Sequence, residues 1–124
     1  MRYEVKMAKV LGVGGVFFKS DNPTKLRDWY SQWLGLDKEG PGVSFSPAKM
    51  PENGYTVWST FDSSTTYFSP SSKEFMFNLI VDHLENALQQ VKEGGAEIVG
   101  KIENYDYGRF GWFMDPDGDK VELW

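Results

Sequence analysis

The chain has 124 residues, a formal net charge of −5 at pH 7 and no cysteine. This length predicts a single domain whose core is large enough to be stable without disulfides. The lack of cysteine excludes disulfides, thiolate zinc sites and cysteine nucleophiles. An acidic balance without a cluster of lysine or arginine argues against nucleic acid as a partner. No apolar run approaches the roughly 18 residues of a membrane helix, and no leading segment resembles a signal peptide, so we expect no membrane partner and a cytoplasmic location.

Aromatic residues are unusually frequent, at 16% of the chain, with five Trp, six Tyr and nine Phe. This is more than the core of a small domain requires. Because aromatic side chains are common in ligand pockets and subunit interfaces, we expect some of them to line one or the other. A small molecule is therefore the expected partner.

The first half of the chain predicts a strand followed by a helix. Residues 1–9 are a mixed polar lead-in, and Val10–Lys19 is strand-like, although its glycines weaken it. Asn22 and Pro23 have the chemistry of an N-cap and a first helical residue, and Gly35 that of a C-terminal cap. Between them, apolar residues recur at helical spacing: Leu26, Trp29, Tyr30, Trp33 and Leu34.

Short strands and a polar segment follow this helix. Strands are expected over Val43–Ala48 and Tyr55–Phe61, with a turn at Pro51–Gly54 between them. Residues 62–74 are rich in Ser and Thr and predict a linker. Its hydroxyls have no histidine base near them in sequence, which argues against a serine nucleophile.

The second half repeats the same order of elements. Phe75–Val81 predicts a buried strand, and Asp82 with Glu85 three residues later has the pattern of a capping box that starts a second helix. Gly94 and Gly95 end that helix, and Ala96–Ile102 predicts the next strand. His83, the only histidine, lies at the helix start, where a surface position is expected.

The last seventeen residues, from Gly108 to Trp124, predict a β-hairpin. Asp115–Gly118 (DPDG) has the sequence of a type I turn followed by a glycine at positive φ. Glu122 stands between Val121 and Leu123, so in a strand its side chain must face the side opposite to theirs. A carboxylate alone on one strand face is either solvated or lines a cavity.

The chain therefore repeats one pattern of strand, capped helix and three strands. Aligning the turns at Gly54 and Gly118 places Trp58 opposite Glu122 in the repeat. We expect an α+β fold in which two tandem βαβββ modules, about residues 9–61 and 75–124, form one domain around a shared cleft.

This pattern resembles the vicinal oxygen chelate superfamily, the group of glyoxalase I, extradiol dioxygenases and bleomycin resistance proteins. The resemblance is carried by WYSQWLGL, from Trp29 to Leu36, and by FGWFMDPDGDKVEL, from Phe110 to Leu123. It implies the glyoxalase/bleomycin resistance fold. In the family's metalloenzymes it also implies a divalent metal in the cleft, held by side chains of the first and last strands of each module.

Only one of the metal-ligand positions implied by this resemblance carries a ligand. Glu122 fills the last-strand position of the second module, but the other positions fall near Val13, near Met76 and at Trp58. A single carboxylate does not hold a catalytic metal. We therefore predict neither a metal site nor a cofactor.

Candidate site residues follow from the strands expected to face the cleft. Glu122 is the candidate catalytic residue, as a general base, or else the anchor of a cationic ligand; it could equally be a relic paired with an arginine. The candidate ligand-binding residues are Phe17, Trp58, Met76, Asn78, Arg109 and Trp112.

Three interpretations of the function remain open on this basis. The first is a metal-independent protein that holds an apolar or aromatic molecule in a cleft lined by Trp, Phe and Met. The second is a lyase, isomerase or dioxygenase of the same superfamily that uses Glu122 as a base or as its only recognisable metal ligand. An interaction module with a self-filled cleft is a third reading. The aromatic surplus is compatible with a homodimer, which the resemblance also suggests.

Overall fold

The computed structural model describes residues 7–9, 11–37 and 42–124. Along these residues the elements are α1 (Pro23–Leu34), the 3-10 helix η1 (Pro47–Lys49), β1 (Phe77–Leu79), α2 (Leu84–Glu93), β2 (Glu97–Tyr105), β3 (Gly108–Met114) and β4 (Lys120–Leu123). The architecture is α+β, as the sequence predicts, with the helices packed on a single mixed sheet.

The four strands lie in the order β1-β4-β3-β2. β1 runs parallel to β4, whereas β4, β3 and β2 are successive antiparallel neighbours. Parallel strands need a long crossover, and α2 supplies it between β1 and the rest of the sheet. The ladder between β1 and β4 continues past both strands, because Val81 N–H donates to the Trp124 carbonyl at 2.8 Å.

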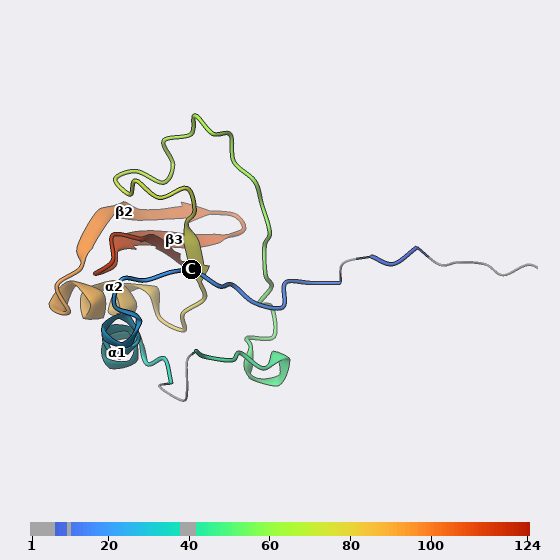
Figure 1. Ribbon diagram of the computed structural model, residues 1–124, viewed down its shortest axis with the longest axis horizontal. Coiled ribbons are helices and arrows are strands. Elements are labelled where there is room, and N and C mark those ends of the chain that lie inside the picture. Colours follow the sequence, from blue (N-terminus) through green and yellow to red (C-terminus); the bar gives the residue numbers. More distant parts are fainter. Residues whose placement is uncertain (1–6, 10, 38–41) are drawn as a thin grey trace, which may run out of the picture.

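Both α helices cover the same face of the sheet (Figure 1). The core lies between them and the sheet, where Phe113, Val121 and Leu123 are fully buried against α-helical side chains such as Val91. The alternation of strand side chains sends these three inward. Residues on the other side of the sheet, here named the open face, include Asn78, Val99, Trp112, Lys120 and Glu122.

Hydrogen bonds join the two helices to each other. Trp29 Nε1 donates to the Gly94 carbonyl at 2.9 Å, and Gln90 Nε2 donates to the Trp33 carbonyl at 2.8 Å. The aromatic residues on the predicted stripe of α1 thus pack between α2 and the sheet, where Trp29 lies 5.9 Å from Phe113 between ring centroids. Trp29 is partly buried and packs against the core.

The predicted ends of α1 are confirmed, and the predicted start of α2 is wrong by one residue. Asn22 Oδ1 accepts a hydrogen bond from Lys25 N, and Gly35 closes the helix at φ 69°. In α2 the N-cap is His83, whose Nδ1 accepts from Asn86 N at 3.3 Å, and not Asp82. An imidazole nitrogen can accept the same bond as a carboxylate, and the chain bends into the helix one residue later.

The predicted hairpin turn is also confirmed. Gly118 N–H donates to the Asp115 carbonyl at 3.0 Å, and Gly118 has φ 79°, a conformation that favours glycine. The turn joins β3 to β4, which brings Trp112 opposite Glu122.

The strands predicted in the first half do not form in the described residues. Residues 11–19, 43–46 and 55–61 are extended or irregular and have no strand partner, while residues 47–49 form η1 instead of continuing a strand; Val10 lies outside the described residues. A strand exists only when its backbone groups pair with a neighbour, and β-propensity alone does not supply one. In Figure 1 the segment before β1, coloured green to yellow, leaves η1 and passes on the side of the sheet opposite the helices.

Two strand ends also differ from prediction. β1 is shorter than the predicted Phe75–Val81, and β2 runs on to Tyr105 instead of ending at Ile102. A shift in the pairing of β2 with β3 between Val99 and Glu103 lets the longer strand continue. Tandem modules at residues 9–61 and 75–124 therefore stay a prediction, with one βαβββ unit, β1 to β4 with α2, formed in the structure.

Candidate functional site

Glu122 lies at the centre of the open face and is held by three hydrogen-bond donors. Asn78 of β1 lies beside it on one side and Trp112 of β3 on the other, as the strand register requires. Asn78 Nδ2 donates to Oε1 at 2.6 Å, and Trp112 Nε1 donates to Oε2 at 2.8 Å. The third donor is the Tyr67 hydroxyl, 2.5 Å from Oε2. We name Glu122, Tyr67, Asn78 and Trp112 the Glu122 cluster.

Tyr67 reaches this cluster from the Ser/Thr-rich segment before β1. Its ring stands edge-on to the ring of Trp112, with centroids 6.3 Å apart, and stacks on Phe61 at 5.6 Å. Burial, together with the hydrogen bond to the negatively charged Glu122, raises the pKa of the Tyr67 hydroxyl above its usual value. The hydroxyl therefore stays protonated and donates to Glu122 throughout the neutral range.

Lys120 is a second charged group on the open face, two residues before Glu122 on β4. Its side chain is only 7% exposed. Nζ donates to the Tyr67 carbonyl at 2.6 Å and lies 5.1 Å from the centroid of the Tyr67 ring and 5.9 Å from that of Trp112. Burial lowers the pKa of the Lys120 ammonium, while Glu122 and Glu103 act in the opposite direction. Aromatic faces stabilise a buried cation in such a position.

A cavity of about 270 Å³ opens over these side chains. It is lined by Tyr67, Val99, Gly100, Lys101, Glu103, Trp112 and Lys120. Its walls are the rings of Tyr67 and Trp112, and its rim carries the exposed Lys101 and Glu103. The arrangement can hold a small molecule against aromatic faces with one buried ammonium beside it.

Further aromatic rings continue along the open face beyond Glu122. Phe110 and Trp124 stack with centroids 6.0 Å apart, and Tyr55 lies 5.0 Å from Trp124. Tyr105 and Tyr107 stack at 5.2 Å and are half-exposed or more. The expectation that part of the aromatic surplus lies outside the core agrees with this arrangement.

The structure brings together three of the predicted site residues, Glu122, Asn78 and Trp112, and separates others from them. Arg109 lies on the helix side of β3, where its guanidinium pairs with Glu85 and its Nε donates to Asn104 Oδ1 at 2.8 Å. It therefore does not reach Glu122 here.

The other three predicted residues lie outside the Glu122 cluster. Phe17 and Trp58 are 95% and 79% exposed, in segments without a strand partner. Met76 precedes β1 and is half-buried, and the β1 residue in register with Glu122 is Asn78. The ligand position that the family resemblance implied near Met76 therefore falls two residues later.

Sequence reasoning missed Tyr67 and Lys120. Lys120 is two residues before Glu122 on β4, so the alternation of side chains along a strand places both on the same face. Tyr67 gave no such signal, because it lies in an irregular segment whose position depends on tertiary contacts.

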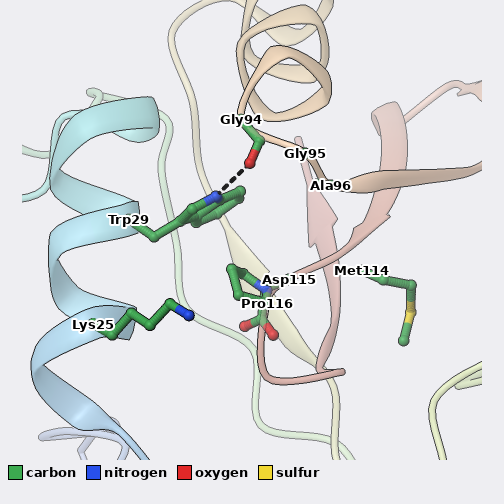
Figure 2. Close-up of a pocket in the computed structure, with 8 residues that line it drawn as sticks. All are labelled: Lys25, Trp29, Gly94, Gly95, Ala96, Met114, Asp115 and Pro116. Carbon is green, nitrogen blue, oxygen red and sulfur yellow. Dashed lines mark hydrogen bonds between the residues drawn. The ribbon is translucent and has the colours of Figure 1, made fainter.

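A second cavity, also of about 270 Å³, lies on the helix side of the sheet, between α1 and the hairpin turn (Figure 2). Lys25 and Trp29 of α1 face Gly94 and Pro116 across it, and the Met114 side chain points away from it. Trp29 closes one side through its hydrogen bond to Gly94. Its polar groups belong to contacts that hold α1 on the sheet, so we assign it a structural role.

Asp115 forms the base of that contact. Its Oδ2 accepts from the Tyr30 hydroxyl at 2.8 Å, and its Oδ1 accepts from the backbone N–H groups of Asp117 and Asp119, each at 2.9 Å. Burial, followed by the neighbouring Asp119 carboxyl, raises the pKa of Asp115 to about 7. The fully buried Asp119 in turn pairs with Lys73 Nζ at 2.7 Å. These carboxyls stabilise the turn that positions β4.

The residues around Glu122 do not fit the metal that the family resemblance implies. Within the described part of the chain, no three His, Cys, Asp or Glu side chains come together as a metal site. The nearest neighbours of the carboxylate are an amide NH₂, an indole N–H and a phenol O–H, all of which point hydrogens at it. A cation needs lone pairs in those positions.

The model of the glyoxalase-like domain family matches residues 15–124. The chain belongs to this family. It is thereby a member of the vicinal oxygen chelate superfamily, and its α+β fold is that of the glyoxalase group. The match spans both halves of the chain, from the glycine-containing segment before α1 to the end of the final hairpin.

Solved structures similar to this glyoxalase-like domain have low sequence identity. One, from Sphaerobacter thermophilus, is a member of the glyoxalase/bleomycin resistance protein/dioxygenase superfamily; it is 22% identical, with a TM-score of 0.47, over 94% of this chain and 96% of that one. A protein from the mobile metagenome of V. Pseudocholerae is 17% identical, with a TM-score of 0.44, over 98% and 96%. A virulence protein from Salmonella typhimurium is 14% identical, with a TM-score of 0.43, over 81% and 84%. A search of curated protein sequences gave no match.

The described helices include none long and apolar enough to cross a membrane.

Proposed function

We propose that this glyoxalase-like domain binds a small apolar or aromatic molecule on the open face without a metal ion. The observation that carries the proposal is the cavity walled by Tyr67 and Trp112, with the Glu122 cluster beside it. Aromatic walls supply apolar contact and stacking at little entropic cost. The Glu122 carboxylate accepts hydrogen bonds from the Trp112 indole and the Tyr67 hydroxyl and so fixes both rings, which organises the site before a ligand arrives.

Glu122 acts in this proposal as a positioning residue. Its two oxygens offer about four lone-pair positions, and three of these already accept hydrogen bonds, two on Oε2 and one on Oε1. The alternative function, a lyase, isomerase or dioxygenase that uses Glu122 as base or metal ligand, is left with the one remaining lone pair, on Oε1 beside the Asn78 amide. The hydrogen-bond geometry therefore favours binding over catalysis.

The test is a ligand screen on metal-free protein, read at the Trp112 indole. Protein with ¹⁵N-labelled tryptophan is treated with chelator and titrated with small aromatic compounds, and Trp112→Phe identifies the resonance. We expect a saturable shift of the Trp112 indole signal with chelator present. The proposal fails if no compound shifts that signal, or if shifts appear only after zinc, manganese or ferrous iron is added.

We also propose that two copies of the chain associate. Large exposed apolar side chains are concentrated before residue 62, Phe17 and Trp58 among them, on segments whose backbone has no strand partner.

A second copy is the occupant that these segments suit, because it presents the same apolar side chains and the same unpaired backbone. Sedimentation equilibrium tests this, with the double variant Phe17→Ser and Trp58→Ser beside the unchanged chain. We expect a dimer that the double variant weakens. A monomer over the whole accessible concentration range contradicts the proposal.

A further inference from the structure

The buried ammonium of Lys120 is not explained by the contacts around it. A lysine ammonium has three N–H donors, and Lys120 uses one of them, for the Tyr67 carbonyl. In the part of the chain that the structure describes, ion pairs join Lys73 to Asp119 and Arg109 to Glu85, but none includes Lys120. Glu122 and Glu103 attract the ammonium without an ion-pair contact to it, and together with the two aromatic rings they offset only part of the cost of its burial.

The cavity places this ammonium where a bound molecule can reach it. Lys120 and the rings of Tyr67 and Trp112 line the same space of about 270 Å³. That volume is just below the range of roughly 300–1,000 Å³ for ordinary ligand pockets, so the occupant has to be small. The two rings meet edge-on, so a planar molecule would lie against this aromatic corner, with one end at the Lys120 Nζ.

The charges that face the cavity favour a negative group at that end. Its lining carries two ammonium groups, of Lys120 and Lys101, against one carboxylate, of Glu103. Lys101 and Glu103 are exposed, so water screens both, whereas Lys120 is buried. Glu122 is not among the residues that line the cavity, and its carboxylate already accepts three hydrogen bonds.

We propose that this cavity is a subsite for a small aromatic carboxylate, with the carboxylate on Lys120 Nζ and the ring against Tyr67 and Trp112. The proposal rests on the proposed binding function and adds the chemical class of the ligand. A ligand carboxylate supplies the direct ion pair that Lys120 lacks, and a charge-assisted hydrogen bond to an ammonium is stronger than one to a neutral donor. Glu122 contributes by holding both rings in place.

The first experiment compares two probes of the same shape, 2-naphthoate and 2-naphthamide, by titration of the Trp112 indole signal. We expect 2-naphthoate to bind at least tenfold more tightly. Lys120→Met should abolish that preference while still binding 2-naphthamide, and Lys120→Arg should retain it. Lys101→Met is the matched control, because Lys101 lines the same cavity but is exposed. In this variant the ratio of the affinities for 2-naphthoate and 2-naphthamide should change less than twofold.

A second experiment needs no variant, so a folding defect cannot obscure the result. The unchanged protein is acetylated with and without 2-naphthoate, and each lysine is quantified by mass spectrometry. We expect the probe to protect Lys120 and to leave the exposed Lys92 unaffected.

The outcomes separate this proposal from the one it rests on. If both probes shift the Trp112 signal with equal affinity, or if Lys120 is not protected, the binding function stands and the carboxylate subsite is wrong. If neither probe shifts the signal, the carboxylate subsite is wrong, and the binding function is then decided by the wider screen of aromatic compounds.

Discussion

The hydrogen bond between Tyr67 and Glu122 predicts a measurable coupling between two residues that are 55 positions apart in the chain. The perturbations are Tyr67→Phe, which removes only the hydroxyl, and Glu122→Gln, which removes the charge and keeps the shape. The double variant closes the cycle. Tyr67→Phe removes the bond, and Glu122→Gln leaves an amide oxygen that accepts it without the charge. The double variant should therefore be less destabilised than the sum of the two.

The magnitude follows from the charge and the exposure of the pair. A hydrogen bond to a charged group contributes about 1.5–3 kcal/mol when buried. Tyr67 is 39% exposed, so water competes for its hydroxyl and the contribution falls below that range. We expect a coupling free energy of about 1 kcal/mol. Glu122→Gln alone should cost more than Tyr67→Phe alone, because it also weakens the bonds from Asn78 and Trp112.

The assay is urea unfolding of the four proteins under identical conditions. Tyr55→Phe serves as the control. Tyr55 also packs on the open face, against Trp124, but it is not one of the donors to Glu122. The coupling free energy between Tyr55→Phe and Glu122→Gln should therefore be near zero. A coupling of the Tyr67 pair no larger than that of the Tyr55 pair would refute the proposed organisation of the site.

Three further predictions concern the fold that carries the site. Burial raises the pKa of Asp115 to about 7 from its ordinary 3.8. Between these two pH values the folded state keeps a proton on Asp115 that the unfolded state has lost. The stability that the protonated carboxyl contributes is therefore complete below about pH 4 and is lost as the pH rises to about 7. The free energy of unfolding of Asp115→Asn should thus fall less steeply over that window, by up to about 1.4 kcal/mol per pH unit. Phe113→Ala should cost about 3–5 kcal/mol, whereas Phe17→Ala should cost no more than about 0.5 kcal/mol in the monomer. A Cβ added at Gly111 would lie 2.6 Å from a leucine methyl of α2, so Gly111→Ala should lower the free energy of unfolding by about 1–3 kcal/mol. The control is Gly12→Ala, because a Cβ added at Gly12 meets nothing within 4 Å.

Each of these predictions has a result that contradicts it. Parallel stability–pH curves for Asp115→Asn and the unchanged protein would show that Asp115 is not the titrating group. Equal losses for the two phenylalanine variants would place the core elsewhere. A Gly111→Ala protein as stable as Gly12→Ala would mean that α2 is not packed closely on β3.

The second half of the fold was predictable because its signals are local and agree with one another. The apolar stripe and the glycines set α2, and Asp115 to Gly118 set the turn, so the register of β4 against β3 follows from the chain itself. The first half carries equally strong strand patterns over residues 11–19 and 55–61, yet no ladder forms there among the described residues. Propensity marks a segment as able to pair, and only a partner strand makes it a strand.

The candidate site was predictable only where it follows from strand parity. Glu122, Asn78 and Trp112 were found because alternation and the hairpin place them on one face. Tyr67 was not, since an irregular segment brings it over the sheet through ring contacts that no local pattern records. Arg109 was expected near the cleft, but parity puts it on the helix side, where Glu85 holds it.

The central claim is that Glu122 is the hydrogen-bonded support of a metal-independent binding site. The most direct test is the metal content of natively purified protein, measured again after incubation with zinc, nickel, manganese and ferrous iron and removal of the excess. We predict no stoichiometric metal in the unchanged protein under any of these conditions. One equivalent of metal per chain that Glu122→Ala loses would contradict the claim and return the site to the metal chemistry of the superfamily.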